Sequence, residues 1–466
     1  MMTIRDDVVA MISRIADAVT TSADAATVAT AAAATSLEKT DALKMKIKHI
    51  TLGVLLAMTT LSAGAQQKTA DLKQFTLEDL NFGGKNYHQM TAKNRWTAWW
   101  GDKPVRLDAE ECALIDPQTG KETTLFTLSN IQKQGGGDGK KVRSLYNVSF
   151  PFADKSWAVI DYGKGRALYD FKADRLIWTR EIEGPVITSD YCPATECTAF
   201  VSGHQLCVLD GRGKTLTLTK DGSRDIVYGQ SVHRDEFGWS KGTFWSPDGT
   251  KLLFTRMDQS MVTDFPLVTI PEAKESLEKG KTGVIATPAP EKYPMAGQKM
   301  HKVTLGIYDL KKGTTIYLKA GDPTDRYFTN PAWSPDGKTI YLFELNRDQN
   351  DCRLVSYDAA TGEKKAELYR ETDDKYVEPL HPIVFLPWDS NKFIMQSQKD
   401  GYNHLYLFNK EGKQLRQLTK GSWVVMDMLG FNTKLKAIVY ASNECSPIQR
   451  NTWMVSLKDG KRTLLD

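Results

Sequence analysis

Residues 225–249 read DIVYGQSVHRDEFGWSKGTFWSPDG, and the stretch ends in a turn, WSPDG, that occurs again at residues 333–337. Proline presets one backbone angle of such a turn, aspartate bonds its own backbone, and glycine adopts positive φ without steric cost. The same five-residue sequence at two places in the chain indicates a repeated structural unit. A longer sequence pattern that repeats around this turn would therefore indicate the type of fold.

A longer pattern recurs along the chain, in which a strand ends in a polar residue and a turn follows. It is found at Ile115-Asp116, Tyr169-Asp170, Leu209-Asp210, Tyr308-Asp309, Tyr357-Asp358, Phe408-Asn409 and Leu457-Lys458. The later steps are about 50 residues, and the span from Asp210 to Asp309 is about two steps, so we expect one more unit near residue 260. A period of roughly 40–50 residues made of four short strands is typical of a propeller blade. The prediction is an all-β, eight-bladed β-propeller, and an irregular array of β-sandwiches is the alternative.

The first 65 residues differ in composition from this repeat. Residues 1–44 are rich in alanine and threonine and have no aromatic side chain, so we expect a weakly ordered extension outside the mature protein. A short basic stretch, an apolar run and a small-residue cleavage pattern follow, which predicts a signal peptide over residues 45–65 and export to the periplasm or beyond. The apolar run is shorter than the ~20 residues of a membrane span. We expect a lead-in segment over residues 66–89 and the propeller over residues 90–466.

Composition excludes several other classes. A net charge of +4 on 466 residues, without an arginine-rich run, gives no electrostatic footprint for nucleic acid. Neither a CxxC pair nor a His/Cys cluster has metal-site spacing, so no metal or other cofactor is expected. Six cysteines are present. Cys192 and Cys197 are close enough in sequence to form a disulfide, and the alternative is that they are buried free thiols.

Several longer motifs together resemble one protein family. They are VYGQSVHRDEFGWSKGTFWSPDG (227–249), RMDQSMVTDFPLV (256–268), YPMAG (293–297), NRDQN (346–350), YVEPLHP (376–382) and DGYNHLY (400–406). In this order they resemble the N-terminal propeller of bacterial dipeptidyl peptidase IV-like enzymes, and among these the prolyl tripeptidyl peptidases. The resemblance runs from about Phe75 to the C-terminus.

This resemblance implies a fold and a function. Such enzymes join an eight-bladed propeller to an α/β-hydrolase domain with a Ser-Asp-His triad, cleave peptides after a proline near a free amino terminus, and form homodimers. The propeller caps the active site. Because the chain ends at Asp466 in what the repeat makes a late blade, we expect the eight-bladed propeller to be incomplete at its C-terminus, without the last strands that close it. We also expect the hydrolase domain to be absent and the chain alone to be inactive. The alternatives are a stand-alone exported binding propeller and a poorly folding fragment with open strand edges.

Within the same motif, Glu236 matches the glutamate with which the family binds a substrate's amino terminus, and Asp235 lies beside it. A partly buried carboxylate offers the ammonium a charge-assisted hydrogen bond. A peptide without that amine leaves the carboxylate unpaired, so the chain end becomes an element of specificity. The alternative is that Glu236 pairs with Arg234 or another basic residue on a solvated loop.

Further polar residues at strand ends are weaker candidates. Arg347, Asn350, Tyr402 and His404 are expected to line the substrate channel, or else to make turn hydrogen bonds and packing contacts between blades. Ser240 fits the GxSxG pattern of a nucleophile, but that motif requires a helix directly after the turn. The WSPDG turn at residues 245–249 follows instead, so we expect Ser240 not to be a nucleophile.

Overall fold

The computed structural model describes residues 74–90, 96–270 and 286–466. They belong to two compact units, Met1–Asn94 and Arg95–Asp466. The described part of the first unit holds two short helices, α3 (Leu77–Leu80) and α4 (Tyr87–Met90). The predicted extension and signal peptide lie outside the described residues. Among the helices that the structure describes, none has the length and apolar character needed to cross a membrane.

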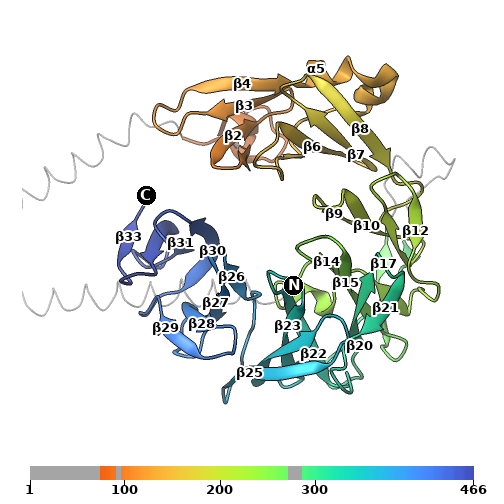
Figure 1. Ribbon diagram of the computed structural model, residues 1–466, viewed down its shortest axis with the longest axis vertical. Helices are drawn as coiled ribbons and strands as arrows, with labels where there is room; N and C mark the ends of the chain where they lie inside the picture. The colour runs from red at the N-terminus through yellow and green to blue at the C-terminus, as the bar shows by residue number, and fades with distance from the viewer. Residues whose placement is uncertain (1–73, 91–95, 271–285) are drawn as a thin grey trace, which may run out of the picture. The chain divides into compact units, whose positions relative to one another are not determined.

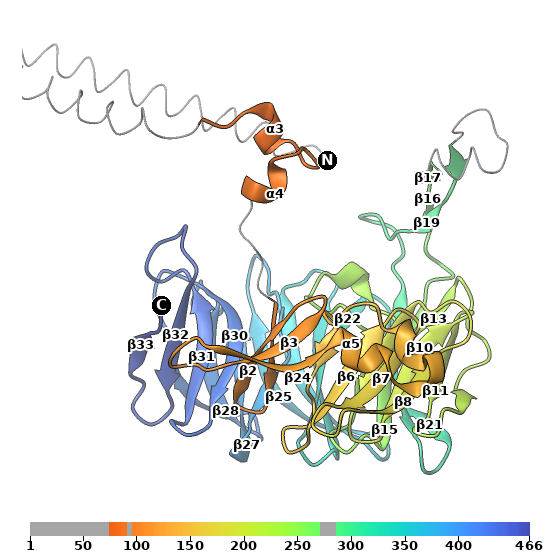
Figure 2. The same ribbon diagram turned by 90° about the horizontal axis from the view of Figure 1, so that it is seen from above.

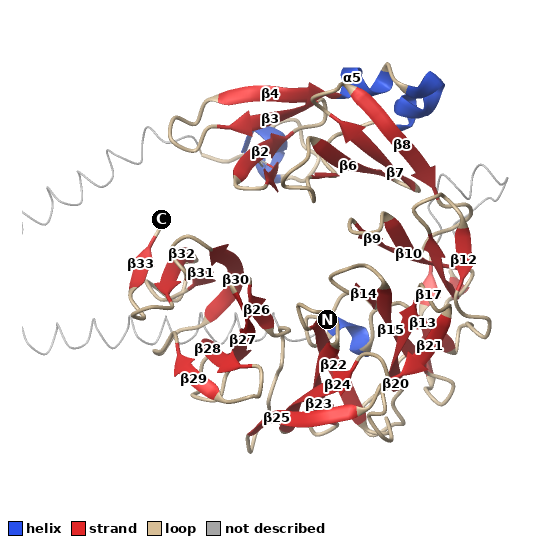
Figure 3. Ribbon diagram, in the orientation of Figure 1, coloured by secondary structure: helices blue, strands red, loops and turns tan. Residues whose placement is uncertain are grey.

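The second unit is a β-propeller, in which antiparallel sheets follow one another around a common axis in chain order (Figure 1). Strands dominate, and the few helices are short (Figure 3). Blade 1 contains β1 (Trp96–Trp100), β2 (Lys103–Leu107), β3 (Glu111–Ile115) and β4 (Glu122–Thr127); α5 (Leu128–Gln132) and the 3-10 helix η1 (Gly135–Lys141) follow. Blade 2 contains β5 (Val148–Ser149), β6 (Trp157–Tyr162), β7 (Gly165–Asp170) and β8 (Arg175–Glu181). Blade 3 contains β9 (Thr188–Cys192), β10 (Cys197–Ser202), β11 (Gln205–Leu209) and β12 (Thr215–Thr217).

Blade 4 differs from the others because two strands share its first position. It contains β13 (Ile226–Tyr228), β14 (Thr243–Trp245), β15 (Lys251–Asp258), β20 (Lys302–Asp309) and β21 (Thr314–Tyr317), with the 3-10 helix η2 (His233–Asp235) between β13 and β14. Residues 259–301, which we call the arm, connect β15 to β20. The arm's strands are β16 (Asp264–Phe265), β17 (Val268–Thr269), β18 (Thr287–Pro288) and β19 (Glu291–Lys292). They pair as β16 with β19 and β17 with β18, and they project from one face of the propeller (Figure 2).

The last three blades each have four strands. Blade 5 contains β22 (Arg326–Trp333), β23 (Thr339–Asn346), β24 (Asp351–Asp358) and β25 (Lys364–Thr372). Blade 6 contains β26 (Val384–Leu386), β27 (Asp389–Ser397), β28 (His404–Asn409) and β29 (Gln414–Gln417). Blade 7 contains β30 (Val425–Asn432), β31 (Ala437–Ser442), β32 (Asn451–Ser456) and β33 (Arg462–Leu464).

The prediction of an all-β propeller is confirmed, but the count of eight units is not, because the described residues form seven blades. Each polar-residue turn of the repeat joins the third and fourth strands of one blade. The span from Asp210 to Asp309 holds blade 4 alone, lengthened by the loop 229–242 and by the arm. The prediction of a further blade near residue 260 was therefore wrong, because an insertion lengthens the spacing between turns without adding a blade.

The recurring aspartates have a local cause. Asp116 Oδ1 accepts hydrogen bonds from the backbone N–H groups of Gln118 and Thr119 over 2.9 and 2.8 Å, and Asp358 does the same for Ala360 and Thr361. Such Asx turns reverse the chain within a few residues. An aspartate at the end of the third strand therefore starts the hairpin to the fourth.

Apolar side chains fill the space between most neighbouring sheets. Leu354 of blade 5 packs with Phe393 of blade 6 in one cluster, and Leu405 of blade 6 packs with Ile438 of blade 7 in another. Similar clusters join blades 1 and 2, 3 and 4, and 4 and 5. At the junction of blades 2 and 3 the apolar cluster is small, with Ile182 packed with Phe200 and Leu209, and polar side chains also cross the boundary.

The six cysteines, all of them among the described residues, are free thiols. Cys192 and Cys197 are register partners on β9 and β10, and both are buried. The structure therefore agrees with the expectation of buried free thiols for Cys192 and Cys197, and not with a disulfide between them.

Candidate functional site

Glu236 lies on a loop that interrupts the first strand of blade 4. Tyr228 of β13 pairs with Arg256, and Thr243 of β14 pairs with Phe254 on the same partner strand, β15. Residues 229–242 therefore leave the sheet and return to it only slightly farther along β15. We call them the Glu236 loop. This excursion lifts Glu236 out of the sheet while both ends of the loop remain fixed in the sheet.

Three aromatic side chains anchor the Glu236 loop. His233, Phe237 and Trp239 are all buried, with 3%, 1% and 4% of their surfaces exposed. Asn330, buried in β22, donates a hydrogen bond from Nδ2 to the carbonyl oxygen of Phe237 over 2.9 Å. The charged residues between these anchors, from Arg234 to Glu236, are exposed. The loop therefore exposes its charged side chains, while its buried aromatic side chains hold its backbone in place.

The backbone at these charged residues is strained. His233, Arg234 and Asp235 have φ values of 54°, 55° and 62°, a left-handed conformation that residues with a side chain rarely adopt. Such strain costs on the order of 1–3 kcal/mol per residue and persists where the surroundings enforce it, commonly at functional sites. Three strained residues in succession directly before Glu236 make this loop the strongest candidate site in the described chain.

Glu236 faces a hollow of about 380 Å³ between the loop, the arm and blade 5. Its lining comprises His233, Arg234, Glu236, Tyr293, Pro294, Met300, His301, Tyr327 and Arg347. Among the described residues, the Glu236 carboxylate makes no hydrogen bond or ion pair. The alternative prediction has Arg234 as the partner of Glu236. In the structure Arg234 pairs with Glu291 of the arm at 3.5 Å and lies 4.8 Å from the ring centre of Tyr293.

The other charges of the hollow are already engaged. Arg347 Nη1 lies 2.7 Å from Asp325 Oδ1, and its Nη2 donates to the carbonyl oxygen of Gln298 on the arm. Burial raises the pKa of the Tyr327 phenol, and the negative charge of Glu236 raises it further. The phenol therefore stays protonated and can donate a hydrogen bond. The hollow thus offers a free carboxylate, held guanidinium groups and a phenol.

The structure brings together some of the residues predicted from sequence and separates others. Arg347 shares the hollow with Glu236, and Asp235 is exposed next to it. Asn350 accepts a hydrogen bond from Asn346 within the β23–β24 turn. Tyr402 is exposed, whereas His404 is fully buried and bonded to Thr419 and Gly421 of blade 6. The channel roles of these last three residues stay predictions. Ser240 is exposed on the Glu236 loop, and β14 rather than a helix follows it.

Sequence reasoning missed the contributions of the arm and of blade 5. Tyr293 belongs to the YPMAG motif, but nothing in that motif indicates that it faces Glu236. His301 and Tyr327 carry no motif of their own. His301 directly follows the irregular segment between the strands, which is its one signal, and Tyr327 has only its aromatic residue type as a signal.

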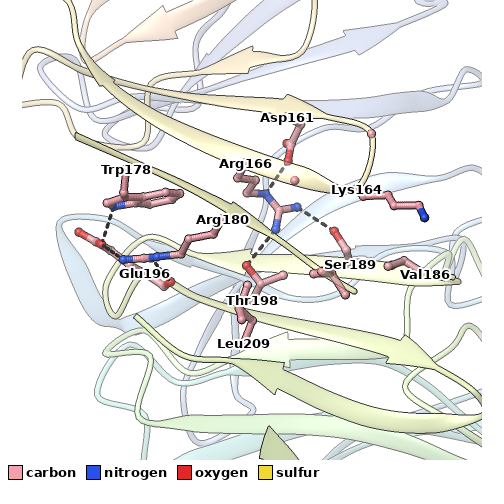
Figure 4. A pocket seen from close by; sticks show the side chains of 13 residues that line it. Asp161, Lys164, Arg166, Trp178, Arg180, Val186, Ser189, Glu196, Thr198 and Leu209 are labelled. Carbon is pink, nitrogen blue, oxygen red and sulfur yellow. Dashed lines mark hydrogen bonds and ion pairs between the residues drawn. The ribbon is translucent and has the colours of Figure 1, made fainter. Parts of the chain in front are cut away.

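A second, smaller hollow of about 40 Å³ lies at the junction of blades 2 and 3 (Figure 4). Arg166 is held there by Asp161, by Thr198 and by Ser189, at 2.5, 3.0 and 2.8 Å. Arg180 lies 3.9 Å from the ring centre of Trp178 and forms an ion pair with a glutamate of blade 3. The volume suits only a water or two, and the guanidinium donors are engaged. This hollow is a polar junction between blades, and we assign it no ligand.

Comparison with known proteins reveals one family. Residues 159–466 match the model of the dipeptidyl peptidase IV (DPP IV) N-terminal region. The chain is 25% identical over 433 residues to a probable dipeptidyl-aminopeptidase B of Pyrenophora teres f. teres, covering 83% of this chain and 46% of that protein. It is 28% identical over 403 residues to a probable dipeptidyl-aminopeptidase B of Emericella nidulans, covering 77% of this chain and 44% of that protein.

Solved structures give the same picture. A putative dipeptidyl aminopeptidase IV from Bacteroides ovatus superposes with a TM-score of 0.74 at 40% identity, covering 84% of this chain and 55% of that one. For dipeptidyl peptidase 4 of Porphyromonas gingivalis the TM-score is 0.65 at 20% identity, with 85% and 56% covered; this second likeness concerns the fold alone. The chain spans about half the length of the relatives that it matches.

Proposed function

Because the chain belongs to the dipeptidyl peptidase IV N-terminal region family, we propose that it is the propeller portion of a proline-specific serine exopeptidase. Its part in proteolysis is to cap the active site and to bind the free amino terminus of a peptide at Glu236. One observation carries the proposal. Glu236 has no partner among the described residues, although the charged groups beside it in the hollow, Arg234 and Arg347, are both paired.

The chemistry of the hollow suits an amine. An α-ammonium group placed against Glu236 gains a charge-assisted hydrogen bond, which is worth about 1.5–3 kcal/mol, or about a tenfold to hundredfold preference. Arg347 faces the same hollow with its geometry fixed by Asp325 and can donate to a carbonyl oxygen of the peptide. Asp235 adds a second negative charge at the rim.

Two further proposals concern the protein's location and its assembly. We propose that the protein acts in the periplasm or outside the cell, on the strength of the signal-peptide pattern. A homodimer through the arm is supported by apolar side chains that the arm exposes, namely Phe265, Leu267, Val268 and Ile270. Sedimentation velocity on the wild type and on a Val268→Asp variant tests it: loss of a dimer in the variant supports the assembly, and a monomeric wild type contradicts it.

Amine recognition is tested by direct binding. A peptide beginning Ala-Ala-Pro, with a fluorophore at its C-terminus, is titrated with the purified chain in free and N-acetylated form. The wild type should bind the free form at least about tenfold more tightly, and this preference should decline as the pH rises through the α-amino pKa of about 7.7–8.0. The preference should disappear in Glu236→Gln.

A matched control is Glu363→Gln, which makes the same change at an exposed glutamate of blade 5 that pairs with Lys319. It should retain the wild-type preference. Equal binding of the free and acetylated peptides by the wild type, or an undiminished preference in Glu236→Gln, would remove the amine-binding role.

A further inference from the structure

Two imidazole rings meet in the lining of the hollow that Glu236 faces, where the arm rejoins blade 4. His233 Nδ1 lies 2.7 Å from His301 Nε2, although the residues are 68 positions apart in the chain. His233 is part of the strained Glu236 loop, and His301 is the last residue of the arm before β20. Both side chains are buried, with 3% and 5% of their surfaces exposed. The contact therefore joins the Glu236 loop to the base of the arm.

The surroundings of this pair are aromatic. The ring centre of His233 lies 6.2 Å from that of Phe237, 6.5 Å from that of Trp239 and 5.0 Å from that of Tyr327. Burial lowers the pKa of His233 well below its ordinary value and lowers the pKa of His301 to about 4. Both rings are therefore neutral near pH 7. In a neutral pair one ring nitrogen donates and the other accepts, so the contact is a directional N–H···N hydrogen bond.

This bond is well placed to hold the strained backbone. The left-handed conformations of residues 233–235 persist only if the surroundings outweigh their cost. His233 is the first of these residues, and its side chain is tied to the arm. Arg234 makes two further contacts between loop and arm, an ion pair with Glu291 and a cation–π contact with Tyr293, and its side chain is about half exposed. Exposed contacts of these kinds contribute little, so the buried histidine pair is the strongest of these links.

We propose that His233 and His301 are positioning residues, whose hydrogen bond lets the arm determine where the Glu236 carboxylate stands. This proposal rests on the proposed role of Glu236. It also goes further, because it makes the arm, a segment outside the repeat, part of the specificity for a free amino terminus. A packing role alone would require only that position 301 be filled by an apolar ring.

The test separates the hydrogen bond from the packing. His301→Phe keeps a buried ring but removes the bond, whereas His301→Gln retains an amide that can donate or accept. We expect His301→Phe to lower the preference for the free over the N-acetylated Ala-Ala-Pro peptide about fivefold, the worth of one hydrogen bond, and His301→Gln to restore most of it. Tyr357→Phe is the matched control, since it removes a buried hydrogen bond to Glu344 in blade 5 and should leave the preference unchanged.

The outcomes distinguish the two proposals. If Glu236→Gln loses the preference while His301→Phe keeps it, the positioning role is overturned and the amine-binding role stands. If Glu236→Gln keeps the preference, both proposals fail. A loss in His301→Phe that His301→Gln does not restore assigns the pair to packing and also overturns the positioning role.

A measurement on the wild type covers the case in which His301→Phe does not fold. In ¹⁵N-histidine-labelled protein, the free peptide should shift the ring signals of His233 and His301, and the acetylated peptide should not. Signals that remain unmoved when the free peptide binds contradict the coupling.

Discussion

The indole nitrogen of Trp333 donates a hydrogen bond to the carbonyl oxygen of Phe244 over 3.0 Å, and this bond joins the first strand of blade 5 to the first position of blade 4. Trp245 repeats the arrangement one blade earlier, where it donates to the carbonyl oxygen of Asp190 over 3.0 Å. The tryptophan of the repeated WSPDG sequence thus links one blade to the preceding one, and only the four residues after it form the turn.

Replacing Trp333 by phenylalanine should therefore destabilise the propeller. The variant keeps an aromatic ring but leaves the Phe244 carbonyl without its donor, so we expect the free energy of unfolding to fall by about 1–3 kcal/mol. Urea denaturation measures it. Trp99→Phe is the control, because Trp99 is 64% exposed and its replacement should change stability by less than about 0.5 kcal/mol. Equal effects of the two substitutions would contradict the role assigned to Trp333.

The aspartate of the same turn provides a second prediction. Asp248 accepts hydrogen bonds from the hydroxyl groups of Ser246 and Thr250 over 2.6 and 2.8 Å. Burial alone would raise its pKa, but these bonds outweigh burial and lower the pKa to about 2. The pKa of Asp248 is thus lower in the folded protein than in the unfolded chain. The ionised carboxylate therefore stabilises the folded state above pH ~4, and this stabilisation is lost as the pH falls toward 2.

Asp248→Ala should accordingly lower the free energy of unfolding by about 1 kcal/mol at pH 7. The difference from the wild type should shrink between pH 4 and pH 3, as followed by urea titrations at each pH. Asp102→Ala, at an exposed position in the turn after β1, serves as the control and should have little effect. A difference that is independent of pH would contradict the role of the charged carboxylate.

The repeat could be predicted from sequence because its cause is local. An aspartate at the end of a strand and a glycine a few residues later form the β3–β4 turn and the β24–β25 turn by contacts within five residues. The number of blades could not be predicted in this way. The spacing between Asp210 and Asp309 contains no sign of whether the extra residues form a blade or an arm, since that depends on which strands pair with β15.

In the candidate site too, a local sequence motif could be recognised, but the tertiary contacts could not. Glu236 could be named as a candidate because its neighbours in sequence form a motif, and its role stays a prediction. Its surroundings could not, because His233 and His301 meet across 68 residues and Arg347 enters from another blade. The left-handed backbone at Arg234 was also hidden, since an arginine does not suggest that conformation. Tertiary contacts enforce that conformation, and the local sequence does not.

The buried histidine pair predicts a dependence of stability on pH. The pKa of His301 is lowered to about 4, and that of His233 is lowered as well, whereas both are about 6.5 in the unfolded chain. Between these values the unfolded state binds more protons, so the free energy of unfolding should fall as the pH decreases from about 6.5 toward 4 and should be level above 6.5. Urea titrations from pH 7.5 to 5 measure the slope.

His301→Phe should make that slope shallower, because one of the histidines whose pKa burial lowers is then missing, while His233 and His381 remain. His204→Gln provides the control, since His204 is exposed on the β10–β11 turn and its replacement should leave the slope as in the wild type. A wild-type slope in His301→Phe would show that the pair does not titrate as its burial requires.

Gly238 offers a prediction that links the backbone of the Glu236 loop to ligand binding. Its φ is +67°, and a Cβ atom there would lie 2.5 Å from the carbonyl oxygen of Leu380, a backbone atom that cannot rotate away. Gly120 has nearly the same φ, +69°, but no atom within 4 Å of the added carbon. Gly120→Ala therefore suffers only the conformational penalty of about 1 kcal/mol, whereas Gly238→Ala must also displace the Glu236 loop. We expect Gly238→Ala to lose about 2–4 kcal/mol in urea denaturation and to reduce the preference for a free over an acetylated amino terminus, which Gly120→Ala should leave intact. If both variants lose stability equally and both keep that preference, then contact with Leu380 does not hold the loop, and the histidine pair and the buried aromatic anchors suffice to position Glu236.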